Sequence, residues 1–149
     1  MAQARTVIHK EVATLNHHIE AVWGIISGFG GIKTWMPAIE SCLLEGDGIG
    51  AVRTVSFKGT SIKERLEIYD PKTHIISYRL LDPTGFPMRG GFGTISLKAI
   101  GDGMTELTWI SDAEEVDAEG IATIEPVLGP FMRENISTIQ SHLDRPAKG

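Results

Sequence analysis

The stretch Arg53–Tyr69, RTVSFKGTSIKERLEIY, predicts a β-hairpin. Two runs rich in β-branched and aromatic residues flank Gly59-Thr60, which is a suitable pair for a two-residue turn. A turn at these two residues predicts three cross-strand pairs: Phe57 with Ile62, Val55 with Glu64, and Arg53 with Leu66. The hairpin indicates an antiparallel sheet, because strands joined by a tight turn run in opposite directions.

One face of this hairpin is apolar except for a single cation and a single anion. Side chains alternate between the two faces of a strand, so one set of residues shares the inner face. That set is Arg53, Val55, Phe57, Ile62, Glu64, Leu66 and Ile68. The other face carries mostly hydroxyl and charged side chains and is expected to face solvent. The alternation therefore places Glu64 and Arg53 inside, diagonally across the hairpin.

An interior glutamate allows two interpretations. A buried carboxylate is costly unless it is paired or hydrogen-bonded, so Glu64 could form a structural ion pair with Arg53. Alternatively, Glu64 faces a cavity, where desolvation raises the pKa of a carboxylate toward that of a useful general base. In that case Arg53 is its counter-charge or holds an anionic group of a ligand.

The rest of the chain predicts an α+β domain. Before the hairpin we expect a strand, a short helix after an N-cap at Asn16, and a second short helical or irregular piece. After it we expect three strands, an acidic loop and a long helix that Gly129-Pro130 can divide into two parts. The expected ranges are strands 6–15, 40–45, 51–58, 61–69, 74–81, 91–100 and 105–111, short helical pieces near 16–27 and 32–37, loop 112–118 and helix 119–143. The predicted fold is a curved antiparallel sheet of about seven strands with the long C-terminal helix across it.

Composition excludes several classes of protein. With 149 residues, the chain fits one domain, residues 1–149, large enough for its own core. The 42% apolar content argues against disorder, and a single cysteine, Cys42, argues against a disulfide scaffold. The longest apolar run is too short for a membrane helix. A net charge of −5 argues against nucleic-acid binding. Met1–Arg5 lacks the apolar stretch of a signal peptide, so we expect a cytoplasmic protein.

Three aromatic residues are further candidates for a site. Tyr78 is placed on the inner face of its strand, either as a core residue with a satisfied hydroxyl or as a hydrogen-bond donor to a bound carbonyl. Trp109 is expected to face inward for packing or for stacking on a ligand. Phe92 is expected to line the same space.

The sequence supports no cofactor or metal. No histidine has metal-ligand spacing with another histidine, a cysteine or a carboxylate. Gly90-Gly91-Phe92-Gly93 opens a strand instead of joining a strand to a helix, so it is not a dinucleotide-binding fingerprint. Cys42 is interpreted as a packed thiol.

Several short motifs, in this order and spacing, resemble a known superfamily. They are Ala21-Val22-Trp23, Phe29, Trp35-Met36-Pro37-Ala38-Ile39, Gly50-Ala51-Val52-Arg53, Glu64-Arg65-Leu66-Glu67 with Asp70, and Ser77-Tyr78. Together they resemble the START/birch-pollen-allergen-like (SRPBCC) helix-grip superfamily. Within it, the chain is most similar to the polyketide cyclase/dehydrase-like members and more distantly similar to the plant abscisic acid receptors.

The resemblance implies a cavity between the sheet and the long helix for a small hydrophobic or amphipathic molecule. It implies that Glu64 faces this cavity and that Tyr78 lines it. Two departures argue against a hormone receptor. Met36 stands where the receptors carry a ligand-anchoring lysine, and Lys58-Gly59-Thr60 is shorter than their gate loop.

Two functions remain open from the sequence. One is a lyase, cyclase or isomerase without cofactor, acting on a small carbonyl compound with Glu64, Arg53 and Tyr78 as catalytic residues. The other is a carrier or sensor that only binds the ligand. The expected ligand-binding residues are Trp35, Met36, Val55, Phe57, Leu66, Phe92, Trp109 and Phe131. We expect no nucleic-acid or membrane partner, and a homodimer is one option for the assembly.

Overall fold

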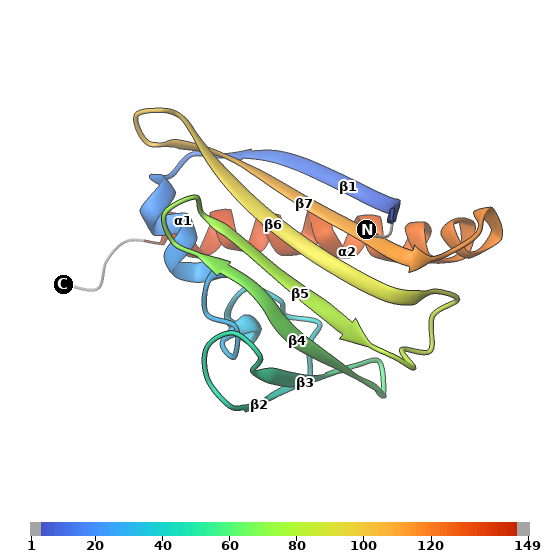
Figure 1. Ribbon diagram of the computed structural model, residues 1–149. Helices are drawn as coiled ribbons and strands as arrows, with labels where there is room; N and C mark the ends of the chain where they lie inside the picture. Colours follow the sequence, from blue (N-terminus) through green and yellow to red (C-terminus); the bar gives the residue numbers. More distant parts are fainter. Residues whose placement is uncertain (1–3, 146–149) are drawn as a thin grey trace.

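The computed structural model describes residues 4–145, which form one antiparallel sheet and a long helix (Figure 1). The elements in chain order are β1 Thr6–Leu15, α1 Ile19–Ile26, the 3-10 turn η1 Ile32–Thr34, β2 Ser41–Glu45, β3 Val52–Phe57, β4 Thr60–Asp70, β5 Ile75–Leu81, β6 Arg89–Gly101, β7 Met104–Glu115 and α2 Ala118–Asp144. The strand order is β1-β7-β6-β5-β4-β3-β2. This confirms the predicted α+β helix-grip architecture.

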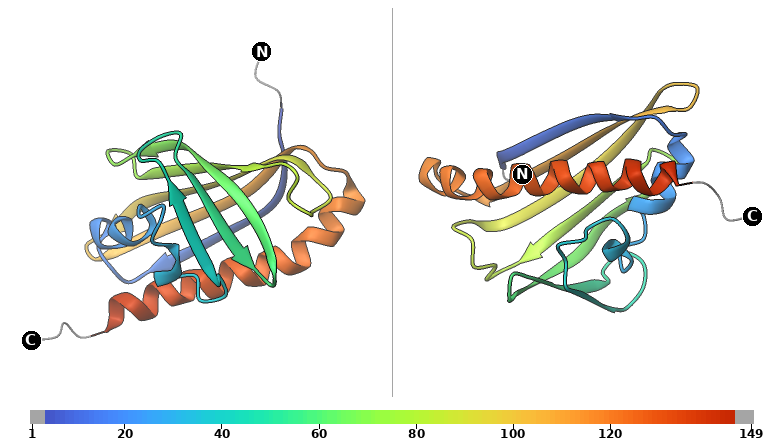
Figure 2. Two further views of the ribbon diagram at one scale, coloured as in Figure 1. Left: turned by 90° about the horizontal axis from the view of Figure 1, so that it is seen from below. Right: turned by 180° about the vertical axis from the view of Figure 1, so that it is seen from behind.

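The long helix α2 crosses one face of the curved sheet, as the two views in Figure 2 show. Its apolar side packs on the inner face of β7 and its neighbours, where Leu107 and Ile139 have no exposed surface. Burying this shared face is the main favourable contribution to folding. The same crossing encloses the space in which the candidate site lies.

The hairpin β3–β4 has the predicted faces but a different register. Arg53 pairs directly with Glu64, and Val55 pairs with Ile62, so the partners are shifted by two residues. The turn is Lys58-Gly59, where φ is 50° and 77°. Two successive positive φ values give the turn type whose twist suits a hairpin. Because the shift is an even number, each residue stays on its predicted face.

A β-bulge changes the end of β4. The pairing with β5 shifts between Leu66 and Ile68, which adds one residue to β4 at this point. As a result Ile68, predicted to face inward, is 47% exposed. The bulge reverses the alternation, as an extra residue in one strand does.

The helix α2 is continuous, so Gly129-Pro130 does not divide it into two parts. Pro126 and Pro130 both lie within it. Each proline removes one backbone hydrogen bond, so the helix persists here because its apolar side is packed on the sheet. Its N-cap is Asp117, whose carboxylate accepts a hydrogen bond of 2.7 Å from the Gly120 amide.

Three smaller expectations are corrected. The N-cap of α1 is His18 and not Asn16. The backbone N–H of Asn16 donates a hydrogen bond to the side-chain oxygen of Gln140 in α2. The second short helical piece is a single 3-10 turn. The acidic stretch predicted to be a loop continues β7 to Glu115, because it pairs with β1 at Ala113 and with β6 at Ala113 and Glu115. Met1–Gln3, part of the stretch interpreted as lacking a signal peptide, lies outside the described residues. Within residues 4–145, no helix is long and apolar enough to span a membrane.

Candidate functional site

A pocket of about 120 Å³ lies between the inner face of the sheet and α2. Its walls come from strands β3 to β7, the loop before β6 and the first half of α2. Its lining residues are Ile39, Val55, Phe57, Ile62, Glu64, Tyr78, Leu80, Phe86, Met88, Phe92, Gly93, Trp109, Ser111, Ile124, Val127, Leu128, Phe131 and Met132. The lining is almost entirely apolar, so the pocket suits a hydrophobic molecule.

Glu64 is the charged residue in this lining. Its Oε1 accepts a hydrogen bond of 2.7 Å from Arg53 Nε, and its side chain is 12% exposed. Within the described part of the chain, its second carboxylate oxygen accepts no hydrogen bond from a side chain. Glu64 can therefore accept a hydrogen bond or a proton from a bound molecule while it remains paired with Arg53.

Arg53 lies behind Glu64 and does not line the pocket. Its side chain is 4% exposed, and its Nη1 donates a hydrogen bond of 3.0 Å to the carbonyl of Phe29. The guanidinium also stacks on two rings, at 4.1 Å from the centroid of Phe29 and 4.8 Å from that of Tyr78. These contacts hold the cation firmly, so Arg53 can act on a ligand only through Glu64 or Tyr78.

Tyr78 lines the pocket together with Glu64. Its hydroxyl accepts a hydrogen bond of 3.2 Å from Trp109 Nε1, so its own proton remains available for another acceptor. Burial, and to a smaller extent the charge of Glu64, raises the pKa of Tyr78, which keeps the phenol neutral and able to donate. The pocket thus offers an acceptor, Glu64, near a donor, Tyr78.

Gly93 makes room for this tyrosine. Gly93 is the cross-strand partner of Tyr78, and a Cβ at Gly93 would lie 2.2 Å from Tyr78 Cζ. The ring therefore lies directly over the bare backbone of β6. Any larger residue at position 93 must displace Tyr78.

Five of the expected ligand-binding residues contribute to the pocket lining: Val55, Phe57, Phe92, Trp109 and Phe131. Phe92 borders the pocket, but its ring lies between the guanidinium groups of Arg5, at 3.9 Å, and Arg79, at 5.2 Å. Arg79 is its cross-strand partner, and it points away from the inner face that carries Tyr78. Phe92 therefore belongs to the lining while its ring lies on the face of β6 opposite Tyr78, and its expected contact with a ligand remains a prediction.

Trp35, Met36 and Leu66 are not part of this lining. They are buried in the main core, with 1%, 4% and 3% of their surfaces exposed. Trp35 packs against Trp109 with a centroid distance of 5.4 Å and is absent from the pocket lining. Their expected contact with a ligand is therefore replaced by packing.

Sequence reasoning missed most of the residues on the helix and loop walls. Ile124 and Leu128 follow the four-residue spacing of apolar residues in the long helix, so helical spacing could have identified them. Phe86 and Met88 come from the irregular segment before β6, where no periodicity gives a signal.

Within residues 4–145, the side chains support neither a metal-ion site nor a reactive thiol. No group of three histidine, cysteine, aspartate or glutamate side chains is arranged to hold a metal ion there. Cys42 is half-buried, and burial raises the pKa of its thiol, which disfavours the reactive thiolate.

Comparisons with known proteins agree with this geometry. The family model described as polyketide cyclase/dehydrase and lipid transport matches residues 7–145. The protein XoxI from Bacillus cereus is 24% identical, with a TM-score of 0.79 over 91% of this chain and 95% of its own.

Two enzymes of known structure have the same fold. Norcoclaurine synthase from Thalictrum flavum is 16% identical, with a TM-score of 0.79 over 99% of this chain and 98% of its own. The Zhui aromatase/cyclase from Streptomyces sp. R1128 is 17% identical, with a TM-score of 0.77 over 95% of each chain. At these identities the similarity establishes the fold, and function has to be argued from the pocket.

Proposed function

Because the chain belongs to the polyketide cyclase/dehydrase and lipid transport family, we propose that it binds a small hydrophobic carbonyl compound and transfers a proton on it through Glu64. The observation that carries this proposal is the Glu64 carboxylate in a mostly apolar pocket whose lining also includes Tyr78. The reaction belongs to the lyase, cyclase or isomerase class and uses no cofactor.

The size of the pocket limits the ligand. An apolar cavity of about 150 Å³ holds one benzene molecule, so a pocket of about 120 Å³ suits a molecule of about one ring. A larger substrate would need α2 or the loop before β6 to move. We therefore expect single-ring ketones to bind better than fused-ring compounds.

The proposed chemistry uses Glu64 and Tyr78 together. The carboxylate of Glu64 removes a proton from the carbon next to the carbonyl, and the electron pair of that C–H bond moves onto the carbonyl oxygen. Tyr78 donates a hydrogen bond to this oxygen and stabilises the enolate as charge develops. If the proton on Glu64 first exchanges with solvent, its return to the same carbon completes a hydrogen exchange; its delivery to a different carbon completes an isomerisation. Arg53 is a positioning residue that holds Glu64.

A carrier without catalysis is the second candidate. The observation in its favour is the 2.7 Å ion pair between Arg53 and Glu64, because a well-satisfied pair also explains an interior carboxylate. In that case the pocket binds the same class of molecule but transfers no proton.

Exchange of carbon-bound hydrogen distinguishes the two candidates. Cyclohexanone in D₂O exchanges its α-hydrogens, and NMR follows the loss of their signal. We expect the wild-type protein to accelerate this exchange and Glu64→Gln to reduce the acceleration by roughly 100-fold or more, because the amide cannot accept the proton.

Glu67→Gln is the matched control. Glu67 lies on the same strand and pairs with Arg65 at 2.7 Å, but it does not line the pocket. It should exchange cyclohexanone at the wild-type rate. Equal rates for wild type and Glu64→Gln contradict the proton-transfer role, and binding without any acceleration supports the carrier.

A further inference from the structure

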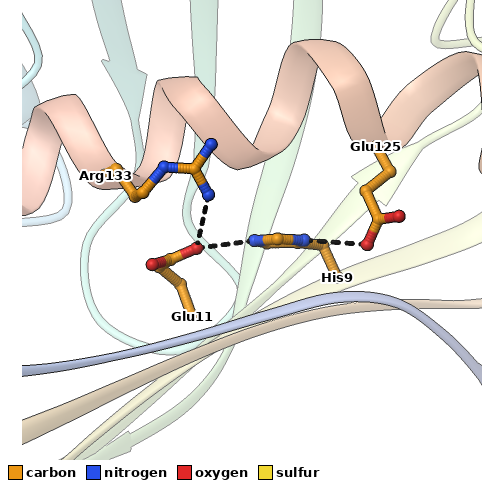
Figure 3. Close-up of polar contacts among 4 residues, drawn as sticks. All are labelled: His9, Glu11, Glu125 and Arg133. Carbon is orange, nitrogen blue, oxygen red and sulfur yellow. Dashed lines mark hydrogen bonds and ion pairs between the residues drawn. The ribbon is translucent and has the colours of Figure 1, made fainter.

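His9 lies outside the pocket, at the contact between β1 and α2 (Figure 3). Its Nε2 is 2.7 Å from Glu11 Oε1, and its Nδ1 is 3.0 Å from Glu125 Oε2. Arg133 Nη1 donates to the same Glu11 oxygen at 3.1 Å. The ring therefore bridges a carboxylate on the sheet and a carboxylate on the helix.

The short contacts of both ring nitrogens with carboxylate oxygens favour a protonated ring. A carboxylate oxygen can only accept, and a neutral imidazole has only one N–H to donate. In the neutral form, one ring nitrogen would direct its lone pair at a carboxylate oxygen 3.0 Å away or closer. Only the imidazolium ion donates to both Glu11 and Glu125.

The groups around His9 agree with this assignment. β1 contributes Glu11, α2 contributes Glu125 and Arg133, and β7 pairs the uncharged Ser111 with His9. Burial lowers the pKa of His9, but the hydrogen bonds and charges of the two glutamates outweigh it, so the pKa is raised. Arg133 opposes protonation but is itself paired with Glu11.

The helix is shaped to receive the ring. Glu125, Gly129 and Arg133 follow one another at four-residue spacing, so they form one stripe along α2. A Cβ at Gly129 would lie 3.2 Å from His9 Cε1, which is tighter than ordinary packing. The glycine thus lets the ring lie against the backbone of the helix, and a β-bulge between Val7 and His9 turns the ring toward it.

The N-terminal half of α2, which carries Glu125 and Gly129, also covers the pocket. Its sequence has a low intrinsic tendency to form a helix. Ile124, Val127, Leu128 and Phe131 line the pocket. Pro126 and Pro130 each remove a backbone hydrogen bond here, and Gly129 is a poor helix former. This half of α2 therefore depends on contacts with the sheet to stay in place.

We propose that His9 binds the pocket-covering half of α2 to β1 only while its imidazole is protonated. Local opening of this half of the helix then becomes more frequent as pH rises. A group whose pKa is raised in the folded state adds stability that is complete below its unfolded pKa, about 6.5 for histidine. This stability is lost as pH rises through the folded value. The equilibrium constant for local opening of residues 121–131 should then increase by about tenfold for each unit by which the pKa of folded His9 exceeds that of unfolded His9.

Hydrogen exchange measured by mass spectrometry tests this without any ligand. Exchange at about pH 6 and about pH 8.5, corrected for the intrinsic rate, should show protection of residues 121–131 falling at the higher pH. Residues 136–143 of the same helix serve as the internal reference. An NMR titration of the His9 ring gives the pKa from which the size of the change is calculated.

His9→Gln should leave residues 121–131 poorly protected at both pH values. His17→Gln is the matched control, because His17 binds Asp144 at the other end of α2 at 2.7 Å, and it should keep the wild-type response. Glu125→Gln removes only the helix partner and should also abolish the response, which keeps the test available if His9→Gln does not fold. A wild-type protein with equal protection at both pH values, or a Glu125→Gln variant with the wild-type response, overturns the proposal.

Discussion

Arg53→Met should lower the free energy of unfolding by about 3–5 kcal/mol, because it leaves the Glu64 carboxylate without its partner in an apolar wall. The substitution keeps an unbranched side chain for packing against Phe29, but it also removes the hydrogen bond to the Phe29 carbonyl, so the loss reports on the ion pair and on this bond together. Urea denaturation monitored by circular dichroism measures the change.

The chain contains its own control for this effect. Arg65 and Glu67 form an ion pair with the same 2.7 Å N–O distance, but Arg65 is 41% exposed, against 4% for Arg53. Arg65→Met should change the free energy of unfolding by no more than about 1 kcal/mol. Arg53→Met combined with Glu64→Leu should regain most of the lost stability. Equal losses for Arg53→Met and Arg65→Met contradict the account of the buried pair.

Gly93→Ala should have the second largest effect. The new Cβ would lie 2.2 Å from Tyr78 Cζ, so the ring must leave its place over β6. We expect a loss of about 1–3 kcal/mol from overpacking. Tryptophan fluorescence should also change, because the Trp109 indole loses its hydrogen bond to the Tyr78 hydroxyl.

Gly91→Ala is the comparison for this variant, since Gly91 lies on the same strand. A Cβ at Gly91 would lie 2.9 Å from the end of the flexible Met88 side chain, which can move at little cost. The loss should therefore be smaller than for Gly93→Ala. Combining Gly93→Ala with Tyr78→Val should recover stability, and a failure to do so shows that the clash lies elsewhere.

Alternation along the strands predicted the most important feature of the site from the sequence. It placed Arg53 and Glu64 on one inner face, and the direct pairing of these two residues confirms it. The register was predicted wrongly because Lys58 adopts φ 50°, a conformation that a lysine rarely takes. The sequence therefore favoured a turn one residue further along the chain.

Other parts of the site could not be predicted from local patterns. Phe92 is flanked by glycines, so no neighbouring side chain indicates its face, and its position between Arg5 and Arg79 depends on two other segments. The continuity of α2 through Pro126 and Pro130 depends on packing against the sheet. The role of His9 is also a matter of tertiary structure, since Glu125 is remote from it in the sequence.

The most direct test of the central claim is an NMR titration of the isotope-labelled protein with cyclohexanone. If the pocket holds one ring with its carbonyl at Tyr78, the amide signals of pocket residues such as Val55, Gly93 and Leu128 should shift and saturate. Ser111→Leu fills part of the 120 Å³ and should abolish these shifts while the fold is retained. Shifts that are absent from the wild-type pocket, or that persist unchanged in Ser111→Leu, contradict the claim.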